Sequence, residues 1–195
     1  MSSARTSVTD LHSMASERAK STNEPDWFDD VFEHHFGYVC RTLQRLGVQR
    51  SDIEDLAQEV FVRVHHLRGR FDRSRPVRPW LFSIALGTAR NYRRSKRRRP
   101  DSDAFELREV DGSSAAESPH RATERSADRQ MLFRILDVLC LEQRALIVMH
   151  DVDGFTIREI AESLGIRARA ATSRLHVARV AFRKAVDRKR EGAEP

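Results

Sequence analysis

The stretch FTIREIAESLGIRARAATSRLHVARVAFRK, residues 155–184, decides the fold of the carboxy-terminal part of this chain. Its apolar side chains recur at helical spacing in two blocks that are separated by Gly165. Thr156 and Glu159 have the spacing of a capping box, which satisfies backbone N–H groups at the start of a helix. Glycine ends a helix at low cost because it adopts a positive φ. The pattern predicts an eight-residue helix, a turn and a second helix, which together form a helix-turn-helix over residues 157–176.

The polar faces of these two helices indicate DNA binding. We expect the first helix to be buried through Ile157, Ile160, Ala161 and Leu164, and the second through Leu175, Ala178 and Phe182, with Ile166 in the hinge. Between Arg158 and Arg190 there are ten lysines and arginines and only three acids. A solvated basic helix pair is the alternative, but the cap, glycine, hinge and basic tail at compatible spacing favour insertion into a major groove.

The composition of the whole chain also favours a polyanionic partner. The 195 residues carry a net charge of +6, with 39% hydrophobic and 33% charged side chains. Nucleic acid and an anionic membrane surface are both open on charge alone. No apolar run reaches the roughly 18 to 20 residues of a membrane span, and the amino terminus lacks the apolar core of a secretory signal. We expect a cytoplasmic protein in which Cys40 and Cys140 are buried thiols.

The amino-terminal half also has helical periodicity, from Pro25 to about Arg94. One apolar stripe runs over Trp27, Phe28, Val31, Phe32, Phe36, Val39, Leu43 and Leu46, and ends at Gly47. Ser51 and Glu54 predict a capping box for a second helix, and a third helix is expected to start near Trp80, after the loop RFDRSRPVRP. No run alternates with period two for long enough to form a sheet. The fold class is therefore predicted to be all-α.

Composition divides the chain into two small helical domains joined by a flexible linker. From Asp101 to Asp128 there are eight acids and three arginines, and such a stretch buries too little surface to offset its ordering entropy. We expect a disordered extension over 1–24, a helical domain over 25–96, an acidic linker over 97–126 and a second helical domain over 127–190.

Two further segments of the first domain carry chemistry. SDIEDLAQEVFVRVHHL, residues 51–67, combines an apolar stripe with an acidic face, which in a basic protein points away from DNA. A merely solubilising acidic face is the alternative. WLFSIALGTARNYRRSKRRR, residues 80–99, mixes aromatic rings with arginines, a combination that suits unpaired bases and phosphates. Each ring taken singly could equally belong to the core.

Taken together, these motifs resemble the bacterial RNA polymerase sigma factors of the extracytoplasmic-function type, in the sigma-70 superfamily. DIEDLAQEVFVRV is similar to segment 2.2, RPWLFSIA with its basic tail to segments 2.3 and 2.4, and GFTIREIAESLGI with RARAATSRLHVAR to segment 4.2. The resemblance implies a region 2 helical bundle and a region 4 helix-turn-helix. It also implies binding to the β′ clamp helices and β flap of core polymerase, melting of the −10 element, reading of the −35 element and control by an anti-sigma factor.

Roles are carried over only to matching positions. The core-polymerase-binding residues would be Asp52, Glu54, Asp55, Gln58, Glu59 and Phe61. The −10 DNA-binding residues would be Arg70, Arg73, Arg75, Arg78, Trp80, Arg90, Asn91, Arg93, Arg94 and Lys96. The −35 DNA-binding residues would be Arg167, Arg169, Thr172, Ser173, Arg174 and His176. The chain departs from the family pattern at Leu86–Gly87, where Arg-Asn is usual, and at residues 169–172, where Gly-Thr-Val-Lys is frequent.

Other classes of protein are less well matched. No nucleophile or carboxylate group is placed near a basic pocket, so neither an enzyme nor a cofactor is expected. No metal is expected either, because His34, His35, His65 and His66 lack a convincing set of further ligands. The basic segments lack a broad apolar face, so membrane insertion is not expected, although an anti-sigma factor could hold the protein at a membrane. A one-component regulator with a helix-turn-helix stays open, but gives no reason for DIEDLAQEVF.

Overall fold

The computed structural model describes residues 27–98 and 131–191, and within these ranges every regular element is helical. This confirms the all-α prediction. The amino-terminal unit contains α2 (Trp27–Arg45), α3 (Ile53–Leu67) and α4 (Val77–Arg98). The carboxy-terminal unit contains α6 (Leu141–Ile147), α7 (Ile157–Leu164) and α8 (Ala168–Glu191), preceded by a helical stretch over 131–138. The extension over 1–24 and residues 99–126 of the linker lie outside the described residues, whereas residues 97–98 belong to α4.

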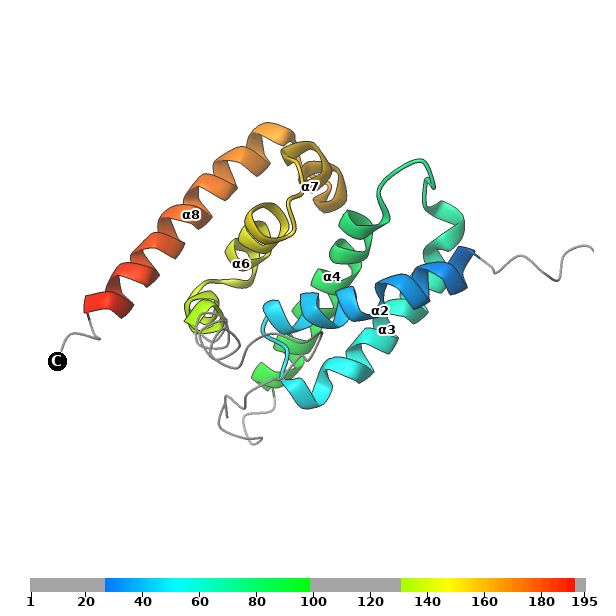
Figure 1. Ribbon diagram of the computed structural model, residues 1–195, viewed down its shortest axis with the longest axis horizontal. Helices are drawn as coiled ribbons and strands as arrows, with labels where there is room; N and C mark the ends of the chain where they lie inside the picture. The colour runs from blue at the N-terminus through cyan, green and yellow to red at the C-terminus, as the bar shows by residue number, and fades with distance from the viewer. Residues whose placement is uncertain (1–26, 99–130, 192–195) are drawn as a thin grey trace, which may run out of the picture.

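Helices α2, α3 and α4 form a bundle in which each helix contacts the other two. Gly47 follows α2 and has a φ of 87°, so the chain turns at the position where the apolar stripe was predicted to end. The centre of the bundle is made of completely buried side chains, including Val39, Leu43, Val60, Val64, Leu81 and Phe82. In Figure 1, α4 lies between α2 and α3 on one side and the carboxy-terminal unit on the other. The bundle therefore places α4 where it can contact both halves of the chain.

The starts of α3 and α4 differ from the prediction. Ser51 does not cap α3, because residues Arg50–Asp52 form a 3-10 turn and the N-cap position falls on Asp52, with no side-chain hydrogen bond. Ser51 Oγ instead donates to Asp52 Oδ1 at 3.0 Å. Helix α4 begins at Val77, one turn before Trp80. Pro79 is tolerated in this first turn because the backbone N–H that it lacks would have no partner within the helix.

Gly87 lies inside α4 and provides a test of local stability. A Cβ built at this position meets nothing within 4 Å, and the residue is only partly exposed. Gly87→Ala is therefore expected to stabilise the fold by about 0.5–1 kcal/mol, because alanine loses less backbone entropy in a helix. Urea unfolding followed by circular dichroism measures this change. A lower midpoint in the variant would show that the helix is strained at this position.

The carboxy-terminal unit contains the predicted helix-turn-helix. Thr156 Oγ1 accepts a hydrogen bond from the Glu159 N–H, the Glu159 carboxylate accepts one from the Thr156 N–H, and Gly165 has a φ of 64°. The capping box and the glycine stop are thus confirmed. Cys140 contradicts the buried-thiol prediction, since it occupies the extended N-cap position of α6 and its side chain is exposed. Cys40 is partly buried, and both cysteines are free.

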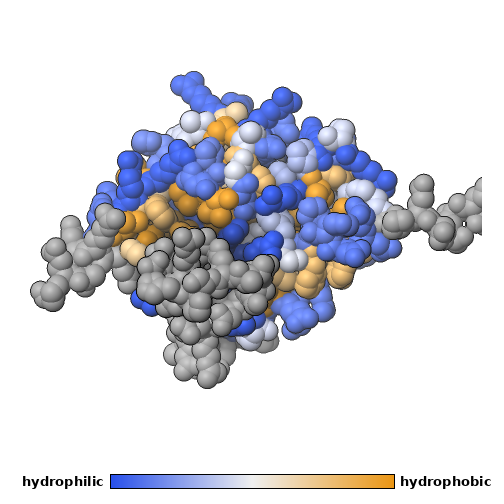
Figure 2. All heavy atoms as spheres, in the orientation of Figure 1, coloured by the Kyte–Doolittle hydropathy of each residue, from blue (hydrophilic) through white to orange (hydrophobic). Residues whose placement is uncertain are grey.

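The two units pack against each other around one continuous hydrophobic cluster. Helix α4 contacts α7, and the rings of Phe82 and Phe155 meet edge to face with centroids 6.4 Å apart. The units also approach closely at Gly47, where a Cβ would collide with the buried guanidinium of Arg144. Hydrophilic residues dominate the outer surface in the view of Figure 2, with apolar residues showing between them. The sequence predicted two tethered domains but gave no sign of this interface.

Candidate nucleic-acid interface

Five of the six predicted polymerase-binding residues lie on α3, and the sixth, Asp52, is its N-cap residue. Glu54, Asp55 and Gln58 are exposed, while Glu59 is half-buried and pairs with Arg63 at 2.5 Å. Phe61 is different, because its side chain is only 2% exposed and packs against the rings of aromatic residues from α2, namely Phe28, Phe32 and Phe36. Phe61 therefore anchors the acidic face to the bundle, and the exposed side chains are the ones available to a partner.

The loop before α4 is held by aromatic stacking. The Phe71 ring stacks on Trp80 with centroids 4.4 Å apart and on Trp27 at 5.5 Å. Arg73 lies over the Trp27 ring at 5.1 Å. Trp80 thus packs against the loop together with Phe71 and Trp27. The sequence indicated Trp27 only as part of the apolar stripe and Phe71 only as part of the loop, and neither was predicted to contribute to the site.

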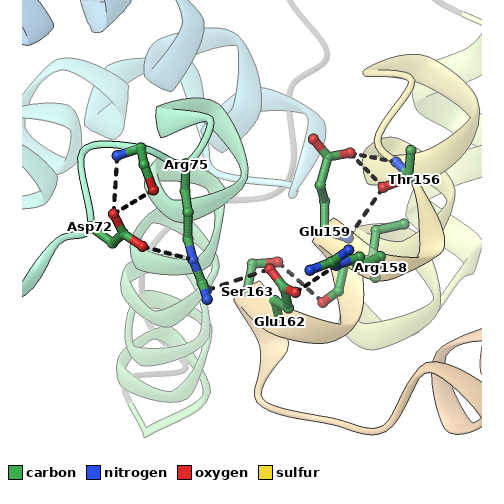
Figure 3. A network of polar contacts seen from close by, with 9 residues as sticks. Asp72, Arg75, Thr156, Arg158, Glu159, Glu162 and Ser163 are labelled. Carbon is green, nitrogen blue, oxygen red and sulfur yellow. Dashed lines mark hydrogen bonds and ion pairs between the residues drawn. The ribbon is translucent and has the colours of Figure 1, made fainter.

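The predicted −10 residues surround this loop and continue down α4. Exposed side chains among them are Arg70, Arg73, Arg75, Arg78, Arg90, Asn91 and Arg94. Arg93 and Lys96 are half-buried, and Arg94 donates to the Asn91 side chain at 3.2 Å. Asp72 accepts hydrogen bonds from the N–H and hydroxyl of Ser74 and pairs with Arg75, which fixes the loop conformation (Figure 3). A row of arginines along one helix and its preceding loop suits a phosphate backbone.

The predicted −35 residues lie together at the start of α8. All six are exposed, namely Arg167, Arg169, Thr172, Ser173, Arg174 and His176. On the opposite side of the helix, Ala171 is fully buried and Leu175 is 4% exposed. The first turns of α8 therefore present short polar side chains and arginines outward, which is the arrangement that reads base edges in a major groove.

Comparison with known proteins is consistent with this geometry. The family model for Sigma-70 region 2 matches residues 31–99, and the one for Sigma-70, region 4 matches residues 129–182. The RNA polymerase sigma factor CarQ of Myxococcus xanthus is 32% identical over 77% of this chain and 84% of its own length. The chain belongs to the RNA polymerase sigma factors of the extracytoplasmic-function type.

Two further similarities support this assignment. The ECF RNA polymerase sigma-E factor of Escherichia coli K12 is 29% identical over 69% of the chain and 74% of its own length. The solved complex of the sigma factor RpoE with the anti-sigma factor NepR from Bartonella quintana matches with a TM-score of 0.62 and 19% identity. That match covers 82% of this chain and 96% of the other. At this identity the likeness concerns the fold alone.

In this sigma factor, Asp52, one of the predicted polymerase-binding residues, is hydrogen-bonded to α4. The Tyr92 hydroxyl donates to Asp52 Oδ2 at 2.6 Å, and Lys96 Nζ lies 3.6 Å from the same oxygen. Burial raises the pKa of Asp52, but hydrogen bonds from Tyr92 and Ser51 and the Lys96 charge outweigh it and leave the pKa below its usual value. Asp52 and Lys96, predicted to serve different partners, therefore form one polar cluster that joins the start of α3 to the end of α4.

A second polar cluster orients α8. The Arg179 guanidinium pairs with the Asp151 carboxylate and contacts His150, both in the π-helical turn Val148–Val152 that follows α6. This hydrogen bond from Arg179 is the main reason why the pKa of Asp151 is lowered, and burial only partly opposes it. The cluster fixes the direction in which the recognition helix leaves the unit.

Residues 27–98 and 131–191 contain no group of three or more His, Cys, Asp or Glu side chains that could hold a metal ion. Within the same part of the chain, no helix combines the length and apolarity that a bilayer crossing needs.

Proposed function

We propose that this sigma factor binds core RNA polymerase through the exposed acidic face of α3, melts the −10 element with α4 and its preceding loop, and reads the −35 element with α8. The observation that carries the proposal is the separation of the two predicted surfaces: the exposed acids Glu54 and Asp55 lie beside Gln58 on α3, whereas the arginines predicted to bind DNA lie on α4, on its preceding loop and at the start of α8. An exposed acidic face repels DNA phosphates, so on a chain of net charge +6 it favours a partner other than DNA.

Tethering explains how two weak DNA contacts can suffice. Each domain bound to polymerase raises the effective concentration of the other at its own promoter element. The protein is thus a dissociable specificity subunit, acts in the cytoplasm and has no catalytic activity of its own. An anti-sigma factor is the proposed controlling partner, because RpoE, which shares the fold, was solved in complex with one.

Run-off transcription with purified core polymerase on a pool of genomic fragments tests this function. Core polymerase with the sigma factor is expected to produce transcripts from a small subset of fragments, and core polymerase alone should produce none of them. Retention of the sigma factor on immobilised core polymerase is measured in parallel. DNA binding without retention on polymerase would favour a one-component regulator instead.

A further inference from the structure

The carboxylate of Asp153 is buried between the two units. Its side chain is 2% exposed, although it follows directly on the π-helical turn of the carboxy-terminal unit. Its partners all come from the other unit: the Tyr38 hydroxyl donates to Oδ2 at 2.8 Å and Arg45 Nη1 donates to Oδ1 at 2.9 Å. Arg78 Nη2 lies 4.0 Å from Oδ1. The amino-terminal unit, region 2, therefore surrounds a carboxylate of the carboxy-terminal unit, region 4. We refer to Tyr38, Arg45 and Arg78 as the socket for this carboxylate.

Two more carboxylates of region 4 face arginines of region 2. Arg75 Nη1 lies 3.4 Å from Glu162 Oε2, as Figure 3 shows from close by. Arg90 Nη2 lies 3.7 Å from Glu142 Oε1. Arg75, Arg78 and Arg90 are all among the arginines predicted to bind −10 DNA, so each of the three carboxylates lies within 4.0 Å of an arginine that the proposed function assigns to DNA.

The compact arrangement of the two units is also too small to reach both promoter elements at once. Elements at −35 and −10 lie about 25 base pairs apart, which is roughly 85 Å at about 3.4 Å per base pair. A compact chain of 195 residues has a radius of gyration of only about 16 Å, and here α7 contacts α4 directly. The two units must separate before both elements can be bound.

We infer that this conformation is a self-inhibited resting state, in which Glu142, Asp153 and Glu162 of region 4 occupy the −10 DNA-binding arginines of region 2. The inference rests on the proposed function. Asp153 holds the interface because it is buried among its donors, while the pairs of Glu142 and Glu162 are exposed and exchange easily for DNA phosphates. Opening and −10 binding are then one coupled equilibrium, and the apparent affinity for DNA falls with the fraction of open molecules.

The first test uses full-length protein and a labelled, mixed-sequence single-stranded DNA of about twenty nucleotides, because phosphate contacts do not depend on sequence. The variants Tyr38→Phe and Arg45→Gln loosen the socket without removing an acid or a predicted DNA-binding residue. If the open form is about one tenth of the population, full opening tightens binding about tenfold. Arg45→Gln is the more decisive variant, because loss of a positive charge by itself would weaken DNA binding.

The second test removes the carboxylates by isosteric substitution. The variant Glu142→Gln, Asp153→Asn, Glu162→Gln is compared with a charge-matched control that changes exposed acids elsewhere, Asp29→Asn, Glu33→Gln, Asp187→Asn. The first variant is expected to bind the DNA several-fold more tightly than the control and to have a larger radius of gyration by X-ray scattering. Equal affinities and equal radii for the two variants would overturn the inference.

Retention on core polymerase separates this inference from the proposed function. If parent and variants are all retained by polymerase but bind the DNA equally, the self-inhibited state is wrong and the sigma-factor function stands. If neither parent nor variants are retained, the proposed function fails, and with it the inference.

Discussion

Asp55→Arg is expected to weaken the binding of the sigma factor to core polymerase strongly. The Asp55 side chain is exposed in the first turn of α3, and no hydrogen bond or ion pair joins it to another side chain within residues 27–98 and 131–191. Placing a like charge opposite a polymerase cation, or removing one partner of a desolvated charge pair, costs about 2–5 kcal/mol. We therefore expect the affinity for core polymerase to fall by about thirtyfold or more. Competition against labelled parent protein on immobilised polymerase measures the loss.

The matched control is Glu33→Arg, which reverses an exposed acid on α2, outside the predicted polymerase-binding set. This variant should retain parental affinity, since it has the same change in net charge without touching α3. Circular dichroism should show the same helix content for both variants. Equal loss in both would mean that overall charge governs polymerase binding, and normal binding by Asp55→Arg would remove α3 from the interface.

Local sequence signals predicted the elements but not their relative placement. The Thr156–Glu159 box and Gly165 defined α7 because every partner in that motif lies within a few residues along the chain. The capping-box spacing also predicted a cap at Ser51, and this prediction was wrong. Residues Arg50–Asp52 form a 3-10 turn, and Asp52 accepts a hydrogen bond from Tyr92, which lies 40 residues away in the sequence. Cys140 was misplaced because an apolar pattern does not reveal an N-cap position.

The interface between the units could not be predicted from the sequence, for a physical reason. Asp153 has no partner within its own stretch of sequence, and its donors Tyr38 and Arg45 are more than a hundred residues away. Periodicity reports which face of a helix is buried, but not which other helix covers it. The exposed positions of the predicted site were easier, because polar residues on the face opposite an apolar stripe remain accessible whatever covers that stripe.

Arg174→Ala is expected to impair recognition of the −35 element while leaving polymerase binding intact. The Arg174 side chain is exposed on α8 and has no hydrogen bond or ion pair with any residue of 27–98 or 131–191. It is therefore free for a base edge or a phosphate. Loss of a bidentate arginine contact to a base costs about 1–3 kcal/mol. Transcription from a promoter selected by the parent should fall by about five- to 150-fold when DNA binding limits the rate.

Arg183→Ala is the control, because Arg183 is an exposed arginine on the same helix, outside the predicted −35 set. A general loss of positive charge would lower transcription in both variants and on every promoter. A specific base contact lowers it only in Arg174→Ala, and randomising the −35 sequence of the template should then abolish the difference between this variant and the parent. If the difference persists on the randomised template, Arg174 contacts only the phosphate backbone. Sequence reading must then come from other side chains at the start of α8, because a contact to the backbone cannot distinguish one base from another.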